Sequence, residues 1–365
     1  MRFLLGIALG FLACVAVFEA VLRNLPVNSG ISMEETSVAE PFARYLPHQP
    51  YVFSHGWALS NARRGVTNSL GFTNAPDSAG QDGILVVGDS FIESLLLDFP
   101  ETLQGRLEQR FPGKIQAISA AGNGLADSLQ IATRFVPRLR PSVVVFFVRP
   151  AELSYLLVAP ERGHNGFVLA DGAQSTADVS IRHSLYSESP NKALVLRSSL
   201  ARYLYYNLKF PAWAAKALTP TLGNAQHAPA GAGDEKYNKG DRAARTLVLN
   251  YYFSQLRTLG SANGCRAIFL LDGDRQALYS GNAGPKQGGD SDDRQLFLSL
   301  AGQYGFDVAD MHPVFKRHWE KVRERMDYLP MDGHWNPVAH KLAAAEVANL
   351  LGSSSEAWKP LARLQ

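Results

Sequence analysis

The sequence predicts an α/β fold in which helices cover both faces of a mainly parallel sheet of about five strands. Three apolar runs, at residues 84–88, 142–148 and 267–271, are short and almost continuous, as strands buried on both faces are. Helix-compatible sequence separates these runs, which favours parallel strands joined by helices. At 365 residues the chain can bury one large core and still carry an inserted segment.

Two weaker strands complete the expected sheet. One, at residues 114–119, ends in a glycine-rich loop, and the other, at residues 306–309, lies close to the C-terminus. The helix that follows the strand at residues 84–88 should end before Pro112 and Gly113, because neither residue continues a helix well. The periodic apolar positions predict helices at residues 93–110, 250–259, 294–304 and 338–351.

The N-terminal segment is apolar enough to interact with a membrane. Residues 3–18 carry no charge, and counting on to Leu22 gives about the 20 residues that cross a bilayer if Glu19 reaches the far interface. An uncleaved anchor at residues 1–25 is the preferred interpretation; a cleaved signal peptide or a lipid anchor at Cys14 remains open. Each alternative places the remaining chain across the membrane, and Arg2 favours a cytoplasmic N-terminus.

The domain organisation follows from where the α/β alternation starts and stops. Residues 26–80 are rich in Pro, Asn, Ser and Gly without a clear period, and we interpret them as a lead-in that packs on the domain. The domain itself is expected at residues 81–352, with an inserted cap at about 152–245 and a tail at 353–365. In the cap, a tyrosine cluster is expected to pack inside a helix rather than to stack on sugars: Tyr203, Tyr205 and Tyr206.

Composition argues against several classes of function. The net charge is +3 and no basic run suggests nucleic acid as a partner. The two cysteines, Cys14 and Cys265, do not indicate a disulfide framework. Without a C-x-x-C pair or a tight His/Cys cluster, neither a zinc site nor any other metal or cofactor is expected.

Ser90 is the first candidate catalytic residue. It follows the strand at residues 84–88 in the sequence Gly88-Asp89-Ser90, so it is expected at the carboxyl edge of the sheet, where ligands bind. A serine there can act as a nucleophile whose own backbone N–H helps to hold an oxyanion. The simpler alternative is that Ser90 is only a helix N-cap.

The second candidate group lies near the C-terminus, before the last helix. Asp332 and His334 stand two residues apart on one loop, so the carboxylate can fix the tautomer of the imidazole. Alone, Asp332 would suggest a turn and His334 a solvated loop residue. His312 is a rival for the role of base; His334 is preferred because Asp332 lies two residues away and a long helix follows.

Together, Gly88-Asp89-Ser90 and Asp332-Gly333-His334-Trp335-Asn336 resemble the SGNH/GDSL hydrolase superfamily. The resemblance covers roughly residues 50–150 and 245–352 and implies a three-layer, flavodoxin-like α/β/α sandwich. More narrowly, the chain is similar to the membrane-anchored SGNH-like proteins of bacterial envelopes, some of which, such as the alginate O-acetyltransferases, move acetyl groups onto polysaccharides.

This resemblance also implies roles for the loops after the second and third strands. A glycine N–H in the first loop, of Gly124 or Gly122, would join the Ser90 N–H at the oxyanion, and Asn123 would add a side-chain donor. After the third strand the family usually has an Asn, whereas this chain has Arg149. Arg149 could stabilise an oxyanion, bind an acidic substrate or merely pair with Glu152. We also considered Asp89 and Trp335 as substrate-binding residues.

The predicted function is therefore that of a serine esterase in which Ser90, His334 and Asp332 form the triad. Its substrate would be an ester, more specifically an O-acetyl group on an envelope or exported polysaccharide. Two alternatives stay open: an O-acetyltransferase, and a catalytically silent protein that binds glycan or scaffolds polysaccharide machinery. The expected location is the bacterial inner membrane, crossed once, with the catalytic domain in the periplasm.

Overall fold

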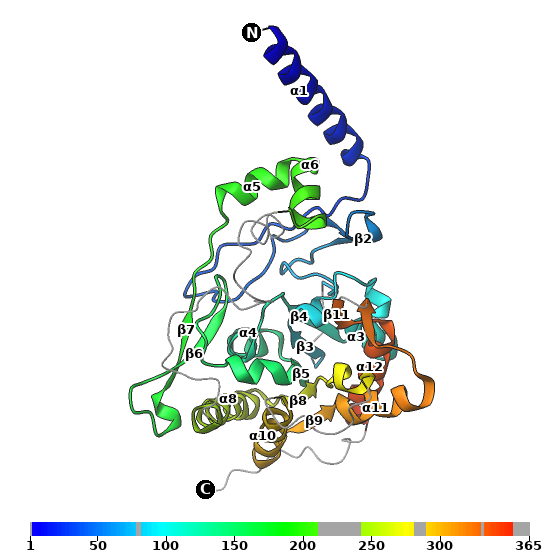
Figure 1. Ribbon diagram of the computed structural model, residues 1–365. Coiled ribbons are helices and arrows are strands. Elements are labelled where there is room, and N and C mark those ends of the chain that lie inside the picture. Colours follow the sequence, from blue (N-terminus) through cyan, green and yellow to red (C-terminus); the bar gives the residue numbers. More distant parts are fainter. Residues whose placement is uncertain (1, 78–81, 211–241, 281–289, 330–331, 353–365) are drawn as a thin grey trace. The chain divides into compact units, whose positions relative to one another are not determined.

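The computed structural model describes residues 2–77, 82–210, 242–280, 290–329 and 332–352 (Figure 1). The predicted tail at 353–365 and part of the predicted cap lie outside these residues. The chain forms two compact units. The first contains, of the described residues, 2–34, 45–71 and 187–210; the second contains 35–44, 72–186 and the described residues from 242 onward.

The second unit is built on a parallel five-stranded sheet in the order β4-β3-β5-β8-β9. The predicted fold class is thus confirmed, and the strand order is that of a doubly wound, flavodoxin-like sheet. Every neighbouring pair of strands is parallel. The strands are β3 (Ile84–Gly88), β4 (Ile115–Ser119), β5 (Val143–Val148), β8 (Arg266–Leu271) and β9 (Asp307–Asp310).

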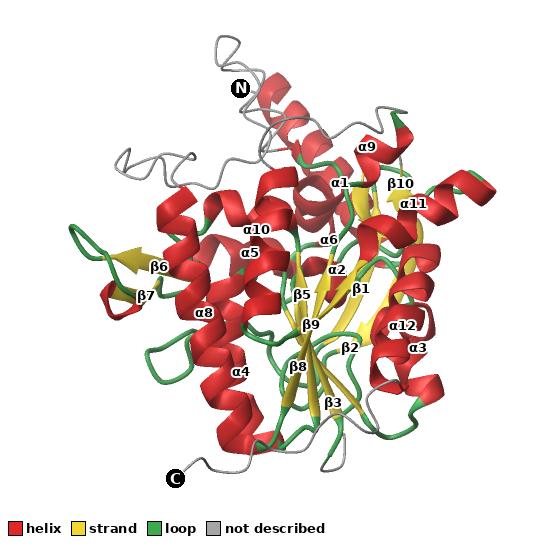
Figure 2. Ribbon diagram, turned by 90° about the horizontal axis from the view of Figure 1, so that it is seen from below, coloured by secondary structure: helices red, strands yellow, loops and turns green. Residues whose placement is uncertain are grey.

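Helices cover both faces of this sheet, which gives the expected three layers (Figure 2). All residues of β3, β4 and β5 are buried, as a sheet covered on both sides requires. One face carries α4 (Leu125–Leu139), α8 (Arg242–Asn263) and α10 (Asp290–Gln303). The other carries α3 (Leu103–Arg110), α11 (Met311–Val322) and α12 (Pro337–Gly352).

The predicted helix at 93–110 is wrong in its first half. Helix α2 (Ser90–Glu93) ends at Ser94, whose φ of 47° lies in the left-handed region. A short 3₁₀ turn, Phe99–Glu101, follows, and Pro100 within it cannot donate a backbone hydrogen bond. Thr102 then caps α3 by accepting the N–H of Gly105. The chain therefore enters α3 from a new direction, and α2 is left as a single turn that carries Ser90.

The second unit also contains several short elements. Two antiparallel hairpins lie in this unit, β6 (Asn165–Leu169) with β7 (Val179–His183) and β10 (Asp327–Leu329) with β11 (Asp332–Trp335). Helix α9 (Arg275–Tyr279) follows β8 directly. Two 3₁₀ turns complete the unit: Pro150–Tyr155 and Thr176–Asp178.

The first unit begins with helix α1 (Arg2–Arg23), which confirms the expected apolar N-terminal helix. Within the described residues it is the one helix long and apolar enough to span a membrane, with a mean hydropathy of 2.4. The rest of this unit comprises β1 (Pro50–His55), β2 (Ser60–Val66), α5 (Pro190–Arg197), α6 (Ser199–Arg202) and a π-helical turn at Tyr203–Asn207.

The hairpin of β1 and β2 was not expected, because residues 26–80 show no clear period. Strand β2 carries charged and small residues and is mostly exposed, so it lacks the apolar alternation that marks a half-buried strand. Gly56 and Leu59 adopt positive φ angles in the turn between the two strands. This turn, rather than hydrophobic periodicity, defines the hairpin.

Candidate active site

The turn between β3 and α2 presents the Ser90 hydroxyl. Asp89 occupies the N-cap position and accepts the N–H of Phe91 at 2.8 Å, so Ser90 itself is not the cap. Gly88 permits the sharp turn, since a Cβ at this position would lie 2.3 Å from Cγ1 of Ile92. The Ser90 side chain is thereby left available for another partner.

That partner is His334 on β11. Nε2 of His334 lies 2.8 Å from Oγ of Ser90, and Nδ1 lies 2.6 Å from Oδ1 of Asp332. The carboxylate favours the tautomer that carries its proton on Nδ1, which leaves Nε2 free to accept the serine proton. The structure thus brings together the three residues that the sequence proposed as a triad.

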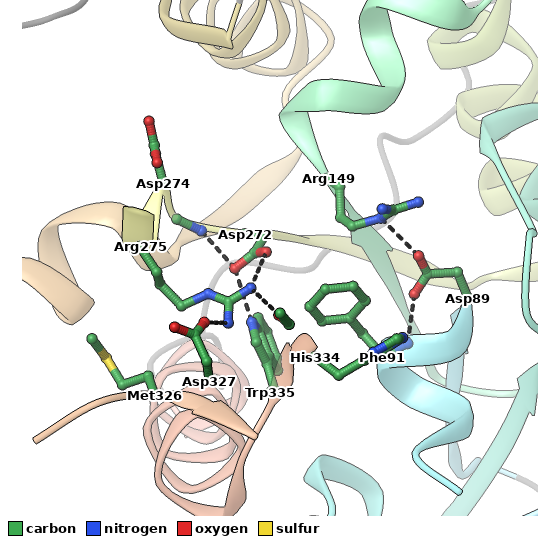
Figure 3. A network of polar contacts seen from close by, with 12 residues as sticks. Asp89, Phe91, Arg149, Asp272, Asp274, Arg275, Met326, Asp327, His334 and Trp335 are labelled. Atoms are coloured by element: carbon green, nitrogen blue, oxygen red, sulfur yellow. Dashed lines mark hydrogen bonds and ion pairs between the residues drawn. The ribbon is translucent and has the colours of Figure 1, made fainter. Parts of the chain in front are cut away.

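A buried polar network holds the strand that carries His334 (Figure 3). Arg275 is only 7% exposed, and its Nη2 donates to the Gly333 carbonyl at 2.8 Å. The same guanidinium pairs with Asp327 and lies 3.3 Å from Oδ2 of Asp272. Asp272 also accepts the indole N–H of Trp335 at 2.9 Å. The carbonyl between Asp332 and His334 is therefore fixed from inside the protein.

Sequence reasoning assigned neither Arg275 nor Asp272 to the site. The available signal was position: Asp272 follows a central strand, and that strand ends at the same sheet edge as the one before Ser90. Nothing in the sequence linked Arg275 to the distant Gly333.

The loop after β4 lies against the Ser90 turn. Asn123 is buried, and its Nδ2 donates to the Gly88 carbonyl at 3.1 Å. The predicted oxyanion role of the Gly124 N–H is wrong, since that group donates to Oδ2 of Asp127 at 2.9 Å. By contrast, the N–H groups of Ser90 and Gly122 have no hydrogen-bond partner among the described residues. Of the two glycines considered, Gly122 is thus the one with a free donor.

A second histidine, which sequence reasoning also missed, lies beside this loop. A Cβ built on Gly122, whose φ is +89°, would lie 3.0 Å from Nε2 of His164. Nδ1 of His164 is 3.4 Å from Oδ2 of Asp127. Burial lowers the pKa of His164, but the hydrogen bond and charge of Asp127 outweigh it and raise the pKa above its usual value.

Arg149 occupies the position at which the resembled family has an Asn. Its Nε lies 2.8 Å from Oδ2 of Asp89 and 2.7 Å from Oε1 of Glu152, so the predicted pair with Glu152 is present. Burial opposes the charge of Arg149, yet the two carboxylates raise its pKa above the ordinary value. Burial raises the pKa of Glu152 to about 8. The Arg149 side chain is 36% exposed, and its Cζ lies 5.5 Å from the centroid of the Phe91 ring.

Two predicted substrate contacts are wrong because the side chains are buried. Asp89 is 2% exposed and is occupied by Phe91 and Arg149. Trp335 is 1% exposed, and its ring centroid packs 5.0 Å from that of Phe147. Both residues support the site from within. The side chain of His334, in contrast, is 34% exposed and can be reached by a ligand.

The arrangement can perform acyl transfer on a serine. It offers a hydroxyl paired with an imidazole, a carboxylate that orients the imidazole, and free backbone N–H groups on the Ser90 turn and the adjacent loop. Within the described ranges, no cluster of three or more His, Cys, Asp or Glu side chains is placed to hold a metal ion.

Comparisons with known proteins find similarity only among solved structures. No family model matches the sequence, and no curated protein matches it. LAE5, an α/β hydrolase enzyme from the metagenome of Lake Arreo, Spain, is 12% identical with a TM-score of 0.40, over 75% of this chain and 96% of that one.

Two further structures are similar to the same extent. TesA is 13% identical with a TM-score of 0.38, over 74% of this chain and 98% of its own. Axe2, an acetylxylan esterase from Geobacillus stearothermophilus, is 12% identical with a TM-score of 0.37, over 75% of this chain and 96% of its own. At this distance, function has to be inferred from the residues of this chain.

Proposed function

We propose that this protein is a serine esterase of the SGNH type, with Ser90 as nucleophile, His334 as base and Asp332 as the carboxylate that orients His334. One observation carries the proposal: the continuous chain of contacts from Ser90 to His334 at 2.8 Å and from His334 to Asp332 at 2.6 Å. Nucleophile, base and orienting group within hydrogen-bond reach are what serine catalysis requires.

In the proposed reaction, Oγ of Ser90 bonds to the ester carbonyl carbon while its proton passes to Nε2 of His334. The N–H groups of Ser90 and Gly122 hold the negative oxygen of the tetrahedral intermediate. The ester C–O bond then breaks, and His334 returns the proton to the departing alcohol. Water attacks the acyl-enzyme, His334 takes the proton of the water, and the bond from the acyl carbon to Oγ breaks as His334 returns that proton to Ser90, which releases the carboxylic acid.

The proposed substrate class is an O-acetyl ester on an envelope or exported polysaccharide. Support comes from the resemblance of the Gly88-Asp89-Ser90 and Asp332-Gly333-His334 motifs to envelope acetyl-transfer proteins and from the apolar helix α1. With a sugar hydroxyl in place of water, the same acyl-enzyme would complete a transfer. We place the protein in the bacterial inner membrane with the triad in the periplasm.

Fluorophosphonate labelling tests the activated serine. The full chain in detergent should be labelled, and Ser90→Ala should abolish the label while the circular dichroism spectrum stays unchanged. Ser142→Ala is the matched control. Ser142 precedes β5 at the opposite edge of the sheet, where its hydroxyl donates to the Gly83 carbonyl. If folded wild type stays unlabelled, the esterase proposal fails, and binding of acetylated glycan without turnover becomes the function to measure.

A further inference from the structure

The end of helix α1 is part of the folded first unit. Glu19 accepts hydrogen bonds from Oγ of Ser198 at 2.8 Å, from the Ser199 N–H at 3.0 Å and from the Leu200 N–H at 2.8 Å. The carboxylate thereby satisfies the first backbone donors of α6. Leu22 and Val27, which follow closely in the chain, are buried. Removal of the N-terminal segment would leave α6 without this cap.

These contacts also set the height of α6 relative to a membrane. At 1.5 Å per residue, residues 3–22 span about 30 Å, the thickness of a bilayer's hydrocarbon core. Glu19 lies three residues, about 4.5 Å along the axis, before Leu22, so it falls within one helical turn of the edge of that core. The first residues of α6, Ser199 and Leu200, bind Glu19. Helix α6 therefore begins near the boundary between the hydrocarbon core and the lipid headgroups. Figure 1 shows α5 and α6 at the base of α1.

Residues 190–210, which contain α5 and α6, expose large apolar side chains. Leu194 is 68% exposed and Tyr205 is 50% exposed, so the expected packing of Tyr205 inside a helix is wrong. Trp57 is 77% exposed and belongs to the same surface, since Oη of Tyr203 donates to its carbonyl at 2.8 Å. Three other apolar residues of the segment are also exposed: Leu204, Leu208 and Phe210.

The charges and aromatic residues of this surface suit a lipid headgroup region. Arg23, Arg197 and Lys209 are exposed beside the apolar residues. Tyrosine and tryptophan prefer the interface between hydrocarbon and water, and basic side chains are attracted to anionic lipids. A surface that is apolar, aromatic and basic at once matches an interfacial segment better than a protein core.

We propose that residues 190–210, together with Trp57, form an interfacial platform that lies in the headgroup layer of the bilayer that α1 spans. The ligand is the membrane surface itself, and Glu19 fixes the platform to the anchor. The proposal depends on α1 being retained as a span, and it is independent of the esterase chemistry at Ser90.

Spin labels in the full chain test the platform. Leu194→Cys and Tyr205→Cys, each in a Cys14→Ala background, are labelled with a nitroxide and reconstituted into nanodiscs of phosphatidylethanolamine and phosphatidylglycerol. Val66→Cys is the control, because Val66 is exposed in the same unit at the end of β2 away from Trp57. Power saturation with oxygen and with a water-soluble nickel complex then measures depth.

We expect the ratio of oxygen to nickel accessibility at positions 194 and 205 to exceed that at position 66 several-fold. Equal ratios at all three positions would overturn the proposal. Labels shielded from both reagents would also overturn it, because they would indicate a protein partner in place of lipid. The mass of the protein purified from its membrane gives a second check: loss of residues 1–25 would refute an anchored platform.

Discussion

Asp332 uses one carboxylate oxygen for two purposes. Oδ1 accepts both the ring Nδ1 of His334 at 2.6 Å and the backbone N–H of the same residue at 3.0 Å. The second contact prevents the carboxylate from rotating away from the ring. A single side chain therefore selects the tautomer and fixes the plane of the imidazole.

Asp332→Asn should abolish most activity while the protein stays folded. An amide favours the wrong imidazole tautomer, which in a serine triad costs about 10,000-fold in kcat. Hydrolysis of p-nitrophenyl acetate measures the loss, and Asp178→Asn, in an exposed turn, serves as control. A variant that keeps more than about a tenth of the wild-type rate would show that Asp332 does not orient His334.

Two glycines of one loop give a matched test of the oxyanion donor. Gly122→Ala introduces a Cβ 3.0 Å from His164 at a φ of +89°, so the loop and its free N–H must shift. Loss of one oxyanion donor lowers kcat by about 100-fold to 1,000-fold. Gly124→Ala should be nearly silent, since its Cβ meets nothing within 4 Å. The reverse result, with Gly124→Ala the impaired variant, would return the donor role to Gly124.

At this scale the sequence predicts the three residues that meet in the candidate site better than the residues that support them. Ser90, Asp332 and His334 lie in short motifs whose chemistry can be read from residue type and spacing. Burial cannot be read in that way, which is why Asp89 and Trp335 were assigned to the substrate. Arg275 was missed because its partner Gly333 is 58 residues away and contributes only a carbonyl.

At the scale of elements, β11 depends on the buried guanidinium of Arg275. Arg275→Met would remove the buried charge that Asp272 and Asp327 share, and breaking a buried ion pair costs about 3 to 5 kcal/mol. Arg325→Met is the control, because Arg325 also binds Asp327, at 3.0 Å, but is 45% exposed and should cost under about 1 kcal/mol. Urea unfolding and kcat measure both effects; equal losses in the two variants would contradict the assigned role.

Elements with a strong apolar signal were predicted well, and those defined by turns were not. Strands β3 and β5 are made of apolar residues and glycine because helices cover both faces of the sheet. The break after α2 depends on Ser94 adopting a left-handed conformation, for which serine has no strong preference. The β1–β2 hairpin depends on its turn at Gly56 and Leu59.

At the scale of the whole molecule, stability should depend on pH through His340. It is fully buried in α12, where Nδ1 accepts the Leu103 N–H at 2.9 Å and Nε2 lies 3.2 Å from Oγ of Ser94. Burial lowers its pKa to about 3, whereas an unfolded histidine titrates near 6.5. Between these values the unfolded state binds the extra proton, so stability is full above pH 6.5 and falls as the pH falls.

Acidification from pH 7 to about pH 4.5 should therefore cost about 3 kcal/mol through this residue alone. His340→Asn keeps an acceptor for the Leu103 N–H but cannot gain a proton. It should be less stable than wild type at pH 7 and lose less on acidification, as judged by urea midpoints across this range. Parallel pH profiles for the two proteins would exclude His340 as the titrating group.

The division into two units could not be read from the sequence. The predicted cap at 152–245 was expected to act as one insertion, but residues 152–186 belong to the α/β unit, whereas residues 187–210 belong with α1 and the β1–β2 hairpin. Contacts such as that of Glu19 with Ser199 join residues that are 180 positions apart in the sequence, and neither residue type indicates which partner it will have.

The distance along the chain between Ser90 and His334, 244 residues, has a consequence for biosynthesis. The ribosome makes Ser90 long before it makes His334, and β11 and α12 are translated after all five strands of the parallel sheet. Until those elements pack, Ser90 has only the weak reactivity of an ordinary alcohol. If Ser90 is the nucleophile we propose, the nascent chain therefore gains its esterase activity only after β11 has packed against the turn that carries Ser90.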